Sequence, residues 1–414
     1  MAKFEIDLNL PDVKIINIET TKAKDLVITV KSTQKSTICH NCGQKIIKIH
    51  GYGDAIMLRH LPILGQDVYI RLRPARFQCE SCDNKPTTTE ETTWYNKRSK
   101  FTKAYEEWLM KMLINSTIYD VARKEDLSSE DVEGVLNRPM EMQVNWDSIE
   151  TLPYFGLDEI ALKKGHKDFV VIVSTRVEDK VKILAILSDR KKETVKAFLE
   201  TIPQRLKETV TTVCSDMYDG YINAAKEVFG NKIKVVIDRF HIAKNYRSCV
   251  DTLRKQELKR LKKELNETDY AKLKGAMWAL RKNAEGLTKQ DKTVLEALFD
   301  HSPSLKEAYD FRNSLTDIFN QNLNKGEAAI LIKEWMNNVK ASQLSCFDKF
   351  IDTLSKNWHE ILNYFYHRQR KNSGFIEGLN NKIKVIKRRC YGIFDLTRLF
   401  QRITLDLTGY ERFA

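Results

Sequence analysis

The chain lacks the long apolar segments that a membrane protein needs. Its longest apolar runs, such as Phe169–Val173 and Ala328–Ile332, are far shorter than the roughly 20 residues with which a helix spans a bilayer. Its first residues, Met1–Asp7, contain no apolar core of the kind found in a secretory signal peptide. These absences exclude an integral membrane protein and argue against secretion, so we expect a cytoplasmic protein without a membrane partner.

Cysteine is too sparse for a disulfide scaffold, and it is unevenly placed. Of the eight cysteines in 414 residues, four form two CxxC pairs, Cys39/Cys42 and Cys79/Cys82. In a chain without a secretory signal, two such pairs indicate a tetrahedral site in which four thiolates hold Zn²⁺. Two chance pairs or a redox dithiol are the alternatives. The remaining cysteines are single and are expected as apolar side chains: Cys214, Cys249, Cys346 and Cys390.

Acidic residues are too few to balance the basic ones. The 69 Lys and Arg exceed the 56 Asp and Glu by 13, while 42% hydrophobic and 30% charged residues are typical of a folded globular chain. An excess of this size favours a polyanionic partner, and nucleic acid is the simplest one. Many basic proteins bind no nucleic acid, so the sequence motifs have to decide whether nucleic acid is the partner.

The first 93 residues predict a small β module around the zinc ligands. The 36 residues between the two CxxC pairs must be filled by strands, and Val68–Leu72 alternates with a period of two. Two further stretches, Lys14–Ile18 and Leu26–Lys31, are strand-like. The Thr- and Glu-rich tract Thr87–Thr93 is predicted to be the linker that leaves the module.

Residues 94–150 change to a helical pattern. Tyr119–Glu125 and Ser129–Arg138 predict two helices around a short turn, with acids in the first turn of the second helix. This arrangement resembles a DNA-binding helix-turn-helix, and a plain packing hairpin is the alternative. Three arginines of the β module either contact DNA phosphates or cover a solvated face: Arg71, Arg73 and Arg76.

After Pro153 strands and helices alternate. The predicted order is strand Tyr154–Leu162, strand Asp168–Thr175, strand Val181–Leu187, helix Lys192–Thr209, strand Val210–Cys214, helix Tyr221–Phe229 and strand Lys232–Ile237. Three strands in a meander followed by helix, strand, helix and strand give the order of a ribonuclease-H-like sheet. In that topology an acid on the first strand lies beside an acid at the end of the fourth.

Asp158 and Asp216 occupy these two positions. A carboxylate among apolar strand residues is costly unless it is paired or binds a cation. Carboxylate oxygens suit Mg²⁺ or Mn²⁺, and two such ions can flank an in-line phosphoryl displacement. The alternative is that both are ordinary turn acids at strand ends.

The last part of the chain offers a third acid, Glu377, in a helix that Ser373 can cap. A carboxylate one turn before an Asn and two turns before a Lys suits metal binding with cations on the phosphates. A solvated basic helix with one balancing Glu is the alternative. The DNA-binding candidates of this helix are Asn380, Lys384, Lys387, Arg388 and Arg389.

These motifs resemble a transposase of bacterial insertion sequences, of the ISL type within the DDE group. The resemblance covers nearly the whole chain and depends on the paired CxxC motifs together with Gly156–Ala161, Lys164–His166, Asp238–His241, Glu377–Lys384 and Tyr391–Gly392. It implies a catalytic triad of Asp158, Asp216 and Glu377, with Mg²⁺ or Mn²⁺ as the catalytic metal.

The resemblance also bears on which acid is the second of the triad. Related transposase groups carry a Cys- or Asp-x-x-His signature just after the second catalytic Asp, and Asp238–His241 matches it. We therefore assign Asp216 rather than Asp238 as the second acid. His241 then contacts the scissile phosphate or a displaced base, or it is only a hydrogen-bonding residue at the strand end.

The fold class expected is a ribonuclease-H-like α/β core that is interrupted by an all-helical insertion. A zinc-binding β module (residues 1–93) and a helix-turn-helix-like segment (94–150) precede the core, whose parts are 151–242 and 371–414. The Lys-rich insertion (243–370) is expected to contact DNA or a second subunit. Trp278 and Trp335 within it are predicted to be core residues rather than platforms for base stacking.

The function predicted is transposition. The protein would bind the terminal inverted repeats of its element through its first 150 residues, cleave at the element ends, and join the 3′ ends to target DNA with two divalent ions. We expect a homodimer or larger assembly on double-stranded DNA, associated with the bacterial nucleoid. The alternatives are a catalytically inactive DNA-binding regulator and a structure-specific nuclease.

Overall fold

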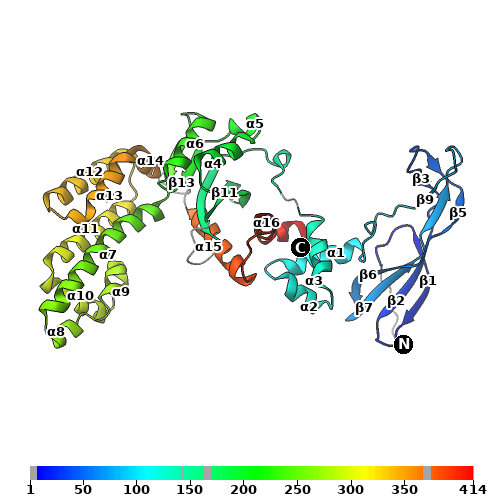
Figure 1. Cartoon of the computed structure of the whole chain (residues 1–414), viewed down its shortest axis with the longest axis horizontal. Helices are drawn as coiled ribbons and strands as arrows, with labels where there is room; N and C mark the ends of the chain where they lie inside the picture. Colours follow the sequence, from blue (N-terminus) through cyan, green and yellow to red (C-terminus); the bar gives the residue numbers. More distant parts are fainter. Residues whose placement is uncertain (1–6, 141–142, 163–168, 179, 367–373, 414) are drawn as a thin grey trace. The chain divides into compact units, whose positions relative to one another are not determined.

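The computed structural model describes residues 7–140, 143–162, 169–178, 180–366 and 374–413, without the side chains of Gly374 and Glu377 (Figure 1). The chain divides into two compact units, residues 1–140 with 408–414, and residues 141–407. Among the described helices, none has the length and apolar character needed to cross a bilayer.

The first unit begins with short sheets. A four-stranded sheet has the order β1-β2-β7-β6, a three-stranded sheet the order β5-β8-β9, and β3 pairs with β4. The strands are β1 (Val13–Thr20), β2 (Leu26–Ser32), β3 (Thr37–Ile38), β4 (Lys45–Ile46), β5 (Ile49–Tyr52), β6 (Ile56–Ile63), β7 (Gln66–Leu72), β8 (Ala75–Gln78) and β9 (Thr87–Thr89). The predicted strands at 14–18, 26–31 and 68–72 are confirmed, and alternate residues of β7 are fully buried.

The prediction of a linker at Thr87–Thr93 is wrong. Thr87–Thr89 forms β9 and pairs with β8, because β-branched threonines fit a strand as readily as they fit a loop. The next residue, Glu90, is only 4% exposed. Its carboxylate accepts the backbone N–H of Ala75 at 2.9 Å and the hydroxyl of Ser32, so that this tract is fixed to the module.

Three helices complete the first unit: α1 (Lys103–Leu113), α2 (Ile118–Lys124) and α3 (Ser129–Asn137). Each begins after a side-chain cap, from Thr102, Thr117 and Ser128 respectively. The two helices predicted around a short turn are confirmed as α2 and α3.

The second unit is built on a five-stranded sheet of order β12-β11-β10-β13-β14. Its strands are β10 (Tyr154–Ala161), β11 (Phe169–Val177), β12 (Lys180–Leu187), β13 (Thr212–Ser215) and β14 (Lys234–Ile237). β11 runs antiparallel to both of its neighbours, whereas β10, β13 and β14 are parallel. The predicted order of strands is confirmed. The single helix predicted over 192–209 is two helices, α4 (Lys192–Glu200) and α5 (Gln204–Lys207), because Pro203 interrupts it.

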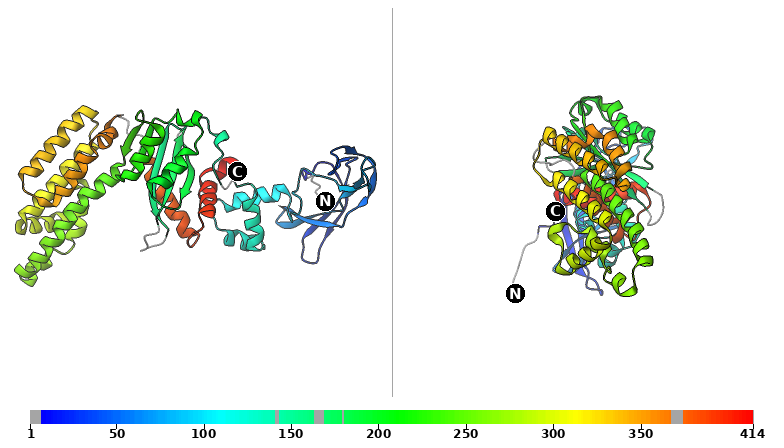
Figure 2. Two further views of the ribbon diagram at one scale, coloured as in Figure 1. Left: turned by 45° about the horizontal axis from the view of Figure 1, so that its top comes forward. Right: turned by 90° about the vertical axis from the view of Figure 1, so that its left-hand side faces the viewer.

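Helices cover both faces of this sheet. Phe155 and Leu157 of β10 pack with α4 and α6 (Asp219–Phe229), whereas Ile160 packs with α15 (Gly374–Arg389) and α16 (Leu396–Phe413). In Figures 1 and 2 the orange-red α15 runs along the sheet. Gly156 lies on the α15 face, where an added Cβ would be 2.6 Å from Oγ of Ser174 and 3.0 Å from Cγ1 of Ile376. The missing side chain therefore allows α15 to approach β10 closely.

The described residues between β14 and α15 are helical and share a core of their own (Figure 1). These helices are α7 (Arg239–Glu264), α8 (Glu267–Ala271), α9 (Ala276–Arg281), α10 (Lys289–His301), α11 (Pro303–Asn320), α12 (Lys325–Ala341), α13 (Asp348–Lys356) and α14 (Trp358–Leu362). Short 3₁₀ turns also occur in this part, namely η2 (Ala284–Gly286), η3 (Ser345–Phe347) and η4 (Asn363–Phe365), whereas η1 (Trp146–Ser148) precedes β10.

Two tryptophans of this helical part, Trp278 and Trp335, differ in exposure. Trp335 is 4% exposed, as predicted for a core residue. The same prediction for Trp278 is wrong, since its side chain is 63% exposed. Ala276, Ala279 and Leu280 form the buried face of α9, and the helical period places Trp278 on the opposite face.

Candidate active site and zinc site

Three aspartates stand at one level of three neighbouring parallel strands. Asp158, Asp216 and Asp238 each follow directly after one of three aligned residues, Leu157, Ser215 and Ile237. Side chains at one level of parallel strands point to the same face. That face is the one covered by α15, because the residues two positions earlier, Cys214 and Val236, pack against Phe375 and Ile376.

Asp158 receives contacts from two helices. It is 8% exposed, and Oδ1 accepts the backbone N–H of Glu159 at 2.7 Å. Oδ2 accepts a hydrogen bond from the side-chain amide of Asn380 in α15, and Nε2 of His241 in α7 lies 3.6 Å from Oδ1. Oδ1 of Asn380 is buried and has no hydrogen-bond partner among the described residues. An amide oxygen that accepts no hydrogen bond therefore lies beside a buried carboxylate. Oxygen atoms of these two kinds are the usual ligands of hard cations such as Mg²⁺.

His241 is in the first turn of α7, where the side chain of Asp238 caps the helix by accepting the N–H of Phe240 at 2.9 Å. Burial alone would lower the pKa of His241. The hydrogen bond to Asp158 and the negative charges of Asp158, Asp216 and Asp238 outweigh burial and raise this pKa above its ordinary value. The imidazole therefore takes up a proton more readily than a free histidine.

Asp216 is in the turn after β13, where it accepts the backbone N–H of Tyr218 at 2.9 Å. Burial raises the pKa of Asp216. The hydrogen bond from Tyr218 and the charge of His241 lower this pKa, but the nearby charges of Glu159 and Asp158 raise it, and the net direction is upward. A bound cation would relieve this crowding of acids.

Glu377 belongs to α15, one turn before Asn380, and its side chain is outside the described residues. The same is true of the predicted motif Lys164–His166. Within the described ranges, the four cysteines are the only group of three or more potential ligands whose donor atoms all lie within 4.8 Å of one another.

The basic residues predicted to bind DNA have different surroundings in α15. Lys384 and Arg388 are exposed. Lys387 donates to the carbonyl of Ala161, and Arg389 pairs with the buried carboxylate of Asp406. Asn380, predicted as a DNA contact, is buried against Asp158, a placement that its position one turn after Glu377 could have suggested.

The three arginines of the β module also have partners within it. Arg71 pairs with Glu19 at 2.8 Å. Arg73 donates to the carbonyl of Gly53 at 3.2 Å, and Arg76 donates to the hydroxyl of Thr87 at 2.7 Å. All three contacts are exposed, so that a DNA phosphate can compete for these guanidinium groups.

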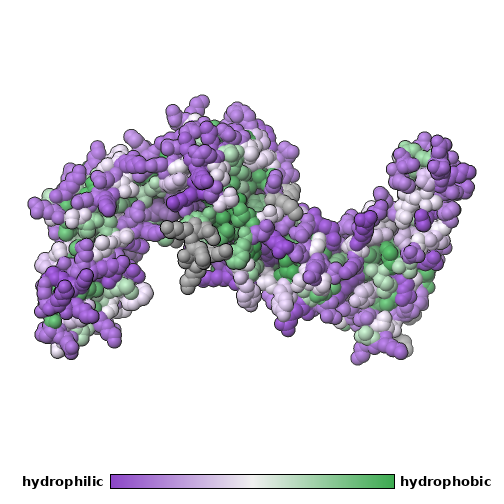
Figure 3. Space-filling model, viewed as in Figure 1, coloured by the Kyte–Doolittle hydropathy of each residue, from purple (hydrophilic) through white to green (hydrophobic). Residues whose placement is uncertain are grey.

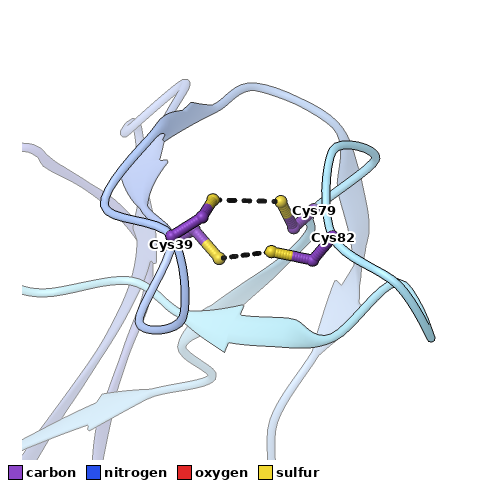
Figure 4. A group of neighbouring side chains, drawn as sticks. Cys39, Cys79 and Cys82 are labelled. Atoms are coloured by element: carbon purple, nitrogen blue, oxygen red, sulfur yellow. Dashed lines mark hydrogen bonds between the residues drawn. The ribbon is translucent and has the colours of Figure 1, made fainter.

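The four cysteines of the CxxC pairs form one cluster (Figure 4). The Sγ atoms of Cys39 and Cys82 are 3.9 Å apart, and those of Cys42 and Cys79 are 3.7 Å apart. A tetrahedral ion with Zn–S bonds of about 2.3 Å requires an S···S spacing of about 3.8 Å, so the cluster fits Zn²⁺. The backbone N–H of Cys42 is the main cause that lowers the pKa of Cys39, and hydrogen bonds within the cluster raise the pKa of Cys82, so Cys39 is the thiol that loses its proton more readily.

Comparison with known proteins agrees with this arrangement. Residues 155–403 match the family model of the ISL3-type DDE transposase, residues 35–82 match the zinc-finger of transposase IS204/IS1001/IS1096/IS1165, and residues 90–138 match the helix-turn-helix domain of transposase family ISL3. The chain belongs to the ISL3 family of DDE transposases. The family and the helix-turn-helix predicted from the sequence are therefore confirmed.

Relatives of this transposase match over nearly their full lengths. The chain is 27% identical over 394 residues to the transposase for insertion sequence element IS1001 of Bordetella parapertussis, which covers 94% of this chain and 93% of the relative. It is 21% identical over 403 residues to the transposase for insertion sequence element IS1557 in two strains of Mycobacterium tuberculosis, covering 91% of this chain and 88% of the relative. These matches favour a transposase over the regulator or nuclease considered from the sequence.

Proposed function

We propose that Asp158, Asp216 and Glu377 are the catalytic acids of this transposase and that its core is ribonuclease-H-like. The observation that carries this proposal is the register that places Asp158 and Asp216 at one level of adjacent parallel strands. The contact between Asn380 and Asp158 supports the third assignment, because Glu377 is one turn before Asn380 in the same helix.

Two steps account for the activity, hydrolysis at the element end and then strand transfer. In the first, water attacks the phosphodiester at an element end, the P–O3′ bond breaks, and the element keeps a 3′-hydroxyl while the flanking strand keeps the phosphate. In the second, that 3′-hydroxyl attacks a target phosphodiester, a new P–O3′ bond forms, and a target 3′-hydroxyl is released. Divalent ions held by the three acids, Mg²⁺ or Mn²⁺, would activate the attacking oxygen and stabilise the leaving one.

The neighbouring side chains prepare this site. Asn380 orients the Asp158 carboxylate through its amide, and its unpartnered Oδ1 leaves an acceptor at the site. Nε2 of His241 lies 3.6 Å from Asp158, a position from which the imidazole can contact the scissile phosphate.

We propose that residues 1–150 bind the terminal inverted repeats and that Zn²⁺ holds the β module in shape. The β module would end at residue 93, the helical segment at 150, the first part of the core at 242 and the helical insertion at 370. Lys384 and Arg388 are the exposed cations of α15 that would neutralise the DNA backbone. Since two element ends must be joined to one target, a dimer or larger assembly on DNA is expected, associated with the nucleoid.

A cleavage and joining assay tests the catalytic proposal. The reaction contains a labelled DNA fragment that carries both ends of the element, a target plasmid and Mg²⁺. We expect Asp158→Asn to lose cut and joined products by about 10³-fold or more, since a catalytic metal contributes several kcal/mol to the transition state. The exposed Asp300 provides the matched control, and Asp300→Asn should remain active.

The assay also separates the alternatives. Cutting by the wild type without joining would indicate a nuclease, and binding without cutting would indicate a regulator. Full activity of Asp158→Asn would contradict the assignment of the catalytic acids.

A further inference from the structure

A cavity of about 390 Å³ lies along α7 in the helical part of the second unit. Five cationic side chains line it but only one acidic side chain does: Lys244, Arg247, Arg254, Arg281, Arg312 and Asp251. In Figure 3 the end of the unit formed by α8–α10 shows mostly hydrophilic residues on the visible face.

Asp251 cannot neutralise this set. Its carboxylate lies 2.9 Å from Arg254 and 3.5 Å from Arg281, so that two of the cations already share it. Lys244 and Arg247 are exposed and make no ion pair within the described ranges. The cavity therefore carries a surplus of positive charge on groups that can reach a ligand.

Arg312 strengthens the case for an anionic ligand. It is 1% exposed, donates to the carbonyl of Lys282 at 2.9 Å and to the carbonyl of Leu280, and its Nε has no partner among the described residues. The two carbonyls are at the end of α9, so Arg312 of α11 connects its own helix to α9 at the cavity wall. A buried guanidinium without a carboxylate is costly unless an anion comes close to it.

The cavity adjoins the candidate active site through the first turn of α7. Phe240 lines the cavity, and its ring meets the ring of His241 edge-on with centroids 5.5 Å apart. Phe240, Lys244, Arg247, Asp251 and Arg254 follow one stripe of α7 at helical spacing. From residue 240 to residue 254 the helix rises about 21 Å, which equals roughly six steps of a DNA strand.

An exposed aromatic ring accompanies the cations. Trp278 is 63% exposed, and the guanidinium of Arg281, which lines the cavity, lies 5.8 Å from the centre of its ring. Cations interleaved with exposed aromatic rings are typical of surfaces that hold a DNA strand without reading its sequence.

We propose that this cavity is a phosphate-binding site for the DNA strand that leads away from the active site. The proposal rests on the transposase function proposed above, since that function brings DNA to His241. The ligand is a row of backbone phosphates, and binding is independent of base sequence. A free nucleotide or inorganic phosphate carries the same chemical group, so the experiment has to distinguish these ligands from the DNA backbone.

The test is a double variant, Lys244→Gln with Arg247→Gln, compared with a matched double variant, Lys259→Gln with Lys262→Gln. Both remove two exposed positive charges from α7, but Lys259 and Lys262 do not line the cavity. The affinity of the full-length protein for a fluorescent 30-bp duplex is measured by anisotropy at several NaCl concentrations, with Ca²⁺ replacing Mg²⁺.

Each phosphate contact contributes about 0.9 to the slope of log affinity against log salt concentration. We therefore expect the slope of the cavity variant to fall by about 1.8 in magnitude, and the slope of the matched variant to stay unchanged. Equal slopes in both variants would overturn the proposal. Equal melting temperatures of the three proteins show that folding is not the cause.

Two further arms separate the sources of phosphate and the two proposals. One arm measures whether millimolar ATP or inorganic phosphate raises the melting temperature of the wild type but not of the cavity variant. If it does, and if the cavity variant and the matched variant have equal salt slopes for DNA, the site holds a free phosphate and the DNA assignment is wrong. Asp158→Asn should keep the wild-type slope. The two proposals fail separately: cleavage retained by Asp158→Asn would contradict the catalytic acids, whereas a wild-type slope in the cavity variant would contradict the phosphate-binding site.

Discussion

The side-chain amide of Asn380 donates a hydrogen bond to Oδ2 of Asp158, although 222 residues separate the two in the sequence. This contact joins α15 to β10, the first strand of the sheet along the chain. It fixes the orientation of a carboxylate that is 8% exposed and leaves the other oxygen of Asp158 facing His241. An outer partner of this kind affects both the affinity of a ligand for its ion and the geometry of the reaction.

Replacing Asn380 with Ala is expected to reduce cleavage of element ends by about 10- to 100-fold, because Asp158 loses the donor that orients it. The loss should be partly recovered at higher Mn²⁺ or Mg²⁺ concentration. Asn381 is the exposed neighbour in the same helix, and Asn381→Ala should behave as the wild type. If both variants cleave equally well, Asn380 has no role in positioning Asp158.

Asp216 and Asp238 can be told apart by replacing each with Asn. Asn caps a helix about as well as Asp, so Asp238→Asn should keep the start of α7 and most of the activity. Asp216→Asn should lose activity by about 10³-fold, as expected for a metal ligand. End cleavage with Mg²⁺ is measured together with melting temperature. The reverse order of activities, with both proteins folded, would make Asp238 the second catalytic acid.

Removing one thiolate should disrupt the zinc site. Cys79→Ser is expected to bind much less than the one Zn²⁺ that we predict per chain, and to bind duplex DNA more weakly, because the CxxC turns depend on the metal for their shape. Zinc content is measured by elemental analysis after dialysis. Cys249 lies outside the cluster and provides the control, so Cys249→Ser should retain full zinc content. Equal zinc content in both variants would argue against a four-cysteine site.

The buried carboxylate of Glu90 should contribute to the stability of the first unit. Glu90→Ala leaves the N–H of Ala75 without its acceptor, and we expect a loss of about 1–3 kcal/mol in the free energy of unfolding. Glu91 is exposed, and Glu91→Ala should change this free energy by less than about 0.5 kcal/mol. Urea unfolding followed by the fluorescence of the buried Trp94 provides the measurement. Similar midpoints for the two variants would show that Glu90 is not a structural anchor.

Local patterns in the sequence were sufficient where each residue's environment is set by its neighbours along the chain. The alternation of Val68–Leu72 predicted β7, and the apolar run before Asp158 predicted the strand that buries it. The order of strands also followed from the sequence, because a meander followed by parallel crossovers leaves few possible arrangements. Asp158 and Asp216 could therefore be paired without knowledge of the structure.

Other features depend on contacts between distant segments and could not be predicted. Thr87–Thr89 is a strand because β8 offers it a free edge, and Trp278 is exposed because three other residues of α9 face the core. The charged cavity forms only where residues of α7, α9 and α11 meet, with Arg312 of α11 bound to the end of α9. No spacing within α7 itself would have revealed it.

The absence of a side chain at Gly156 allows the close approach of β10 and α15, the two elements that carry Asp158 and Asn380. Gly156 precedes Asp158 by two residues and touches the helix that carries Asn380, through Ile376. A methyl group at position 156 would push α15 away from β10. The Asn380–Asp158 contact would then lengthen, although no acidic residue has been altered. The Asn380–Asp158 contact of the proposed active site thus depends on a position that contributes no functional group.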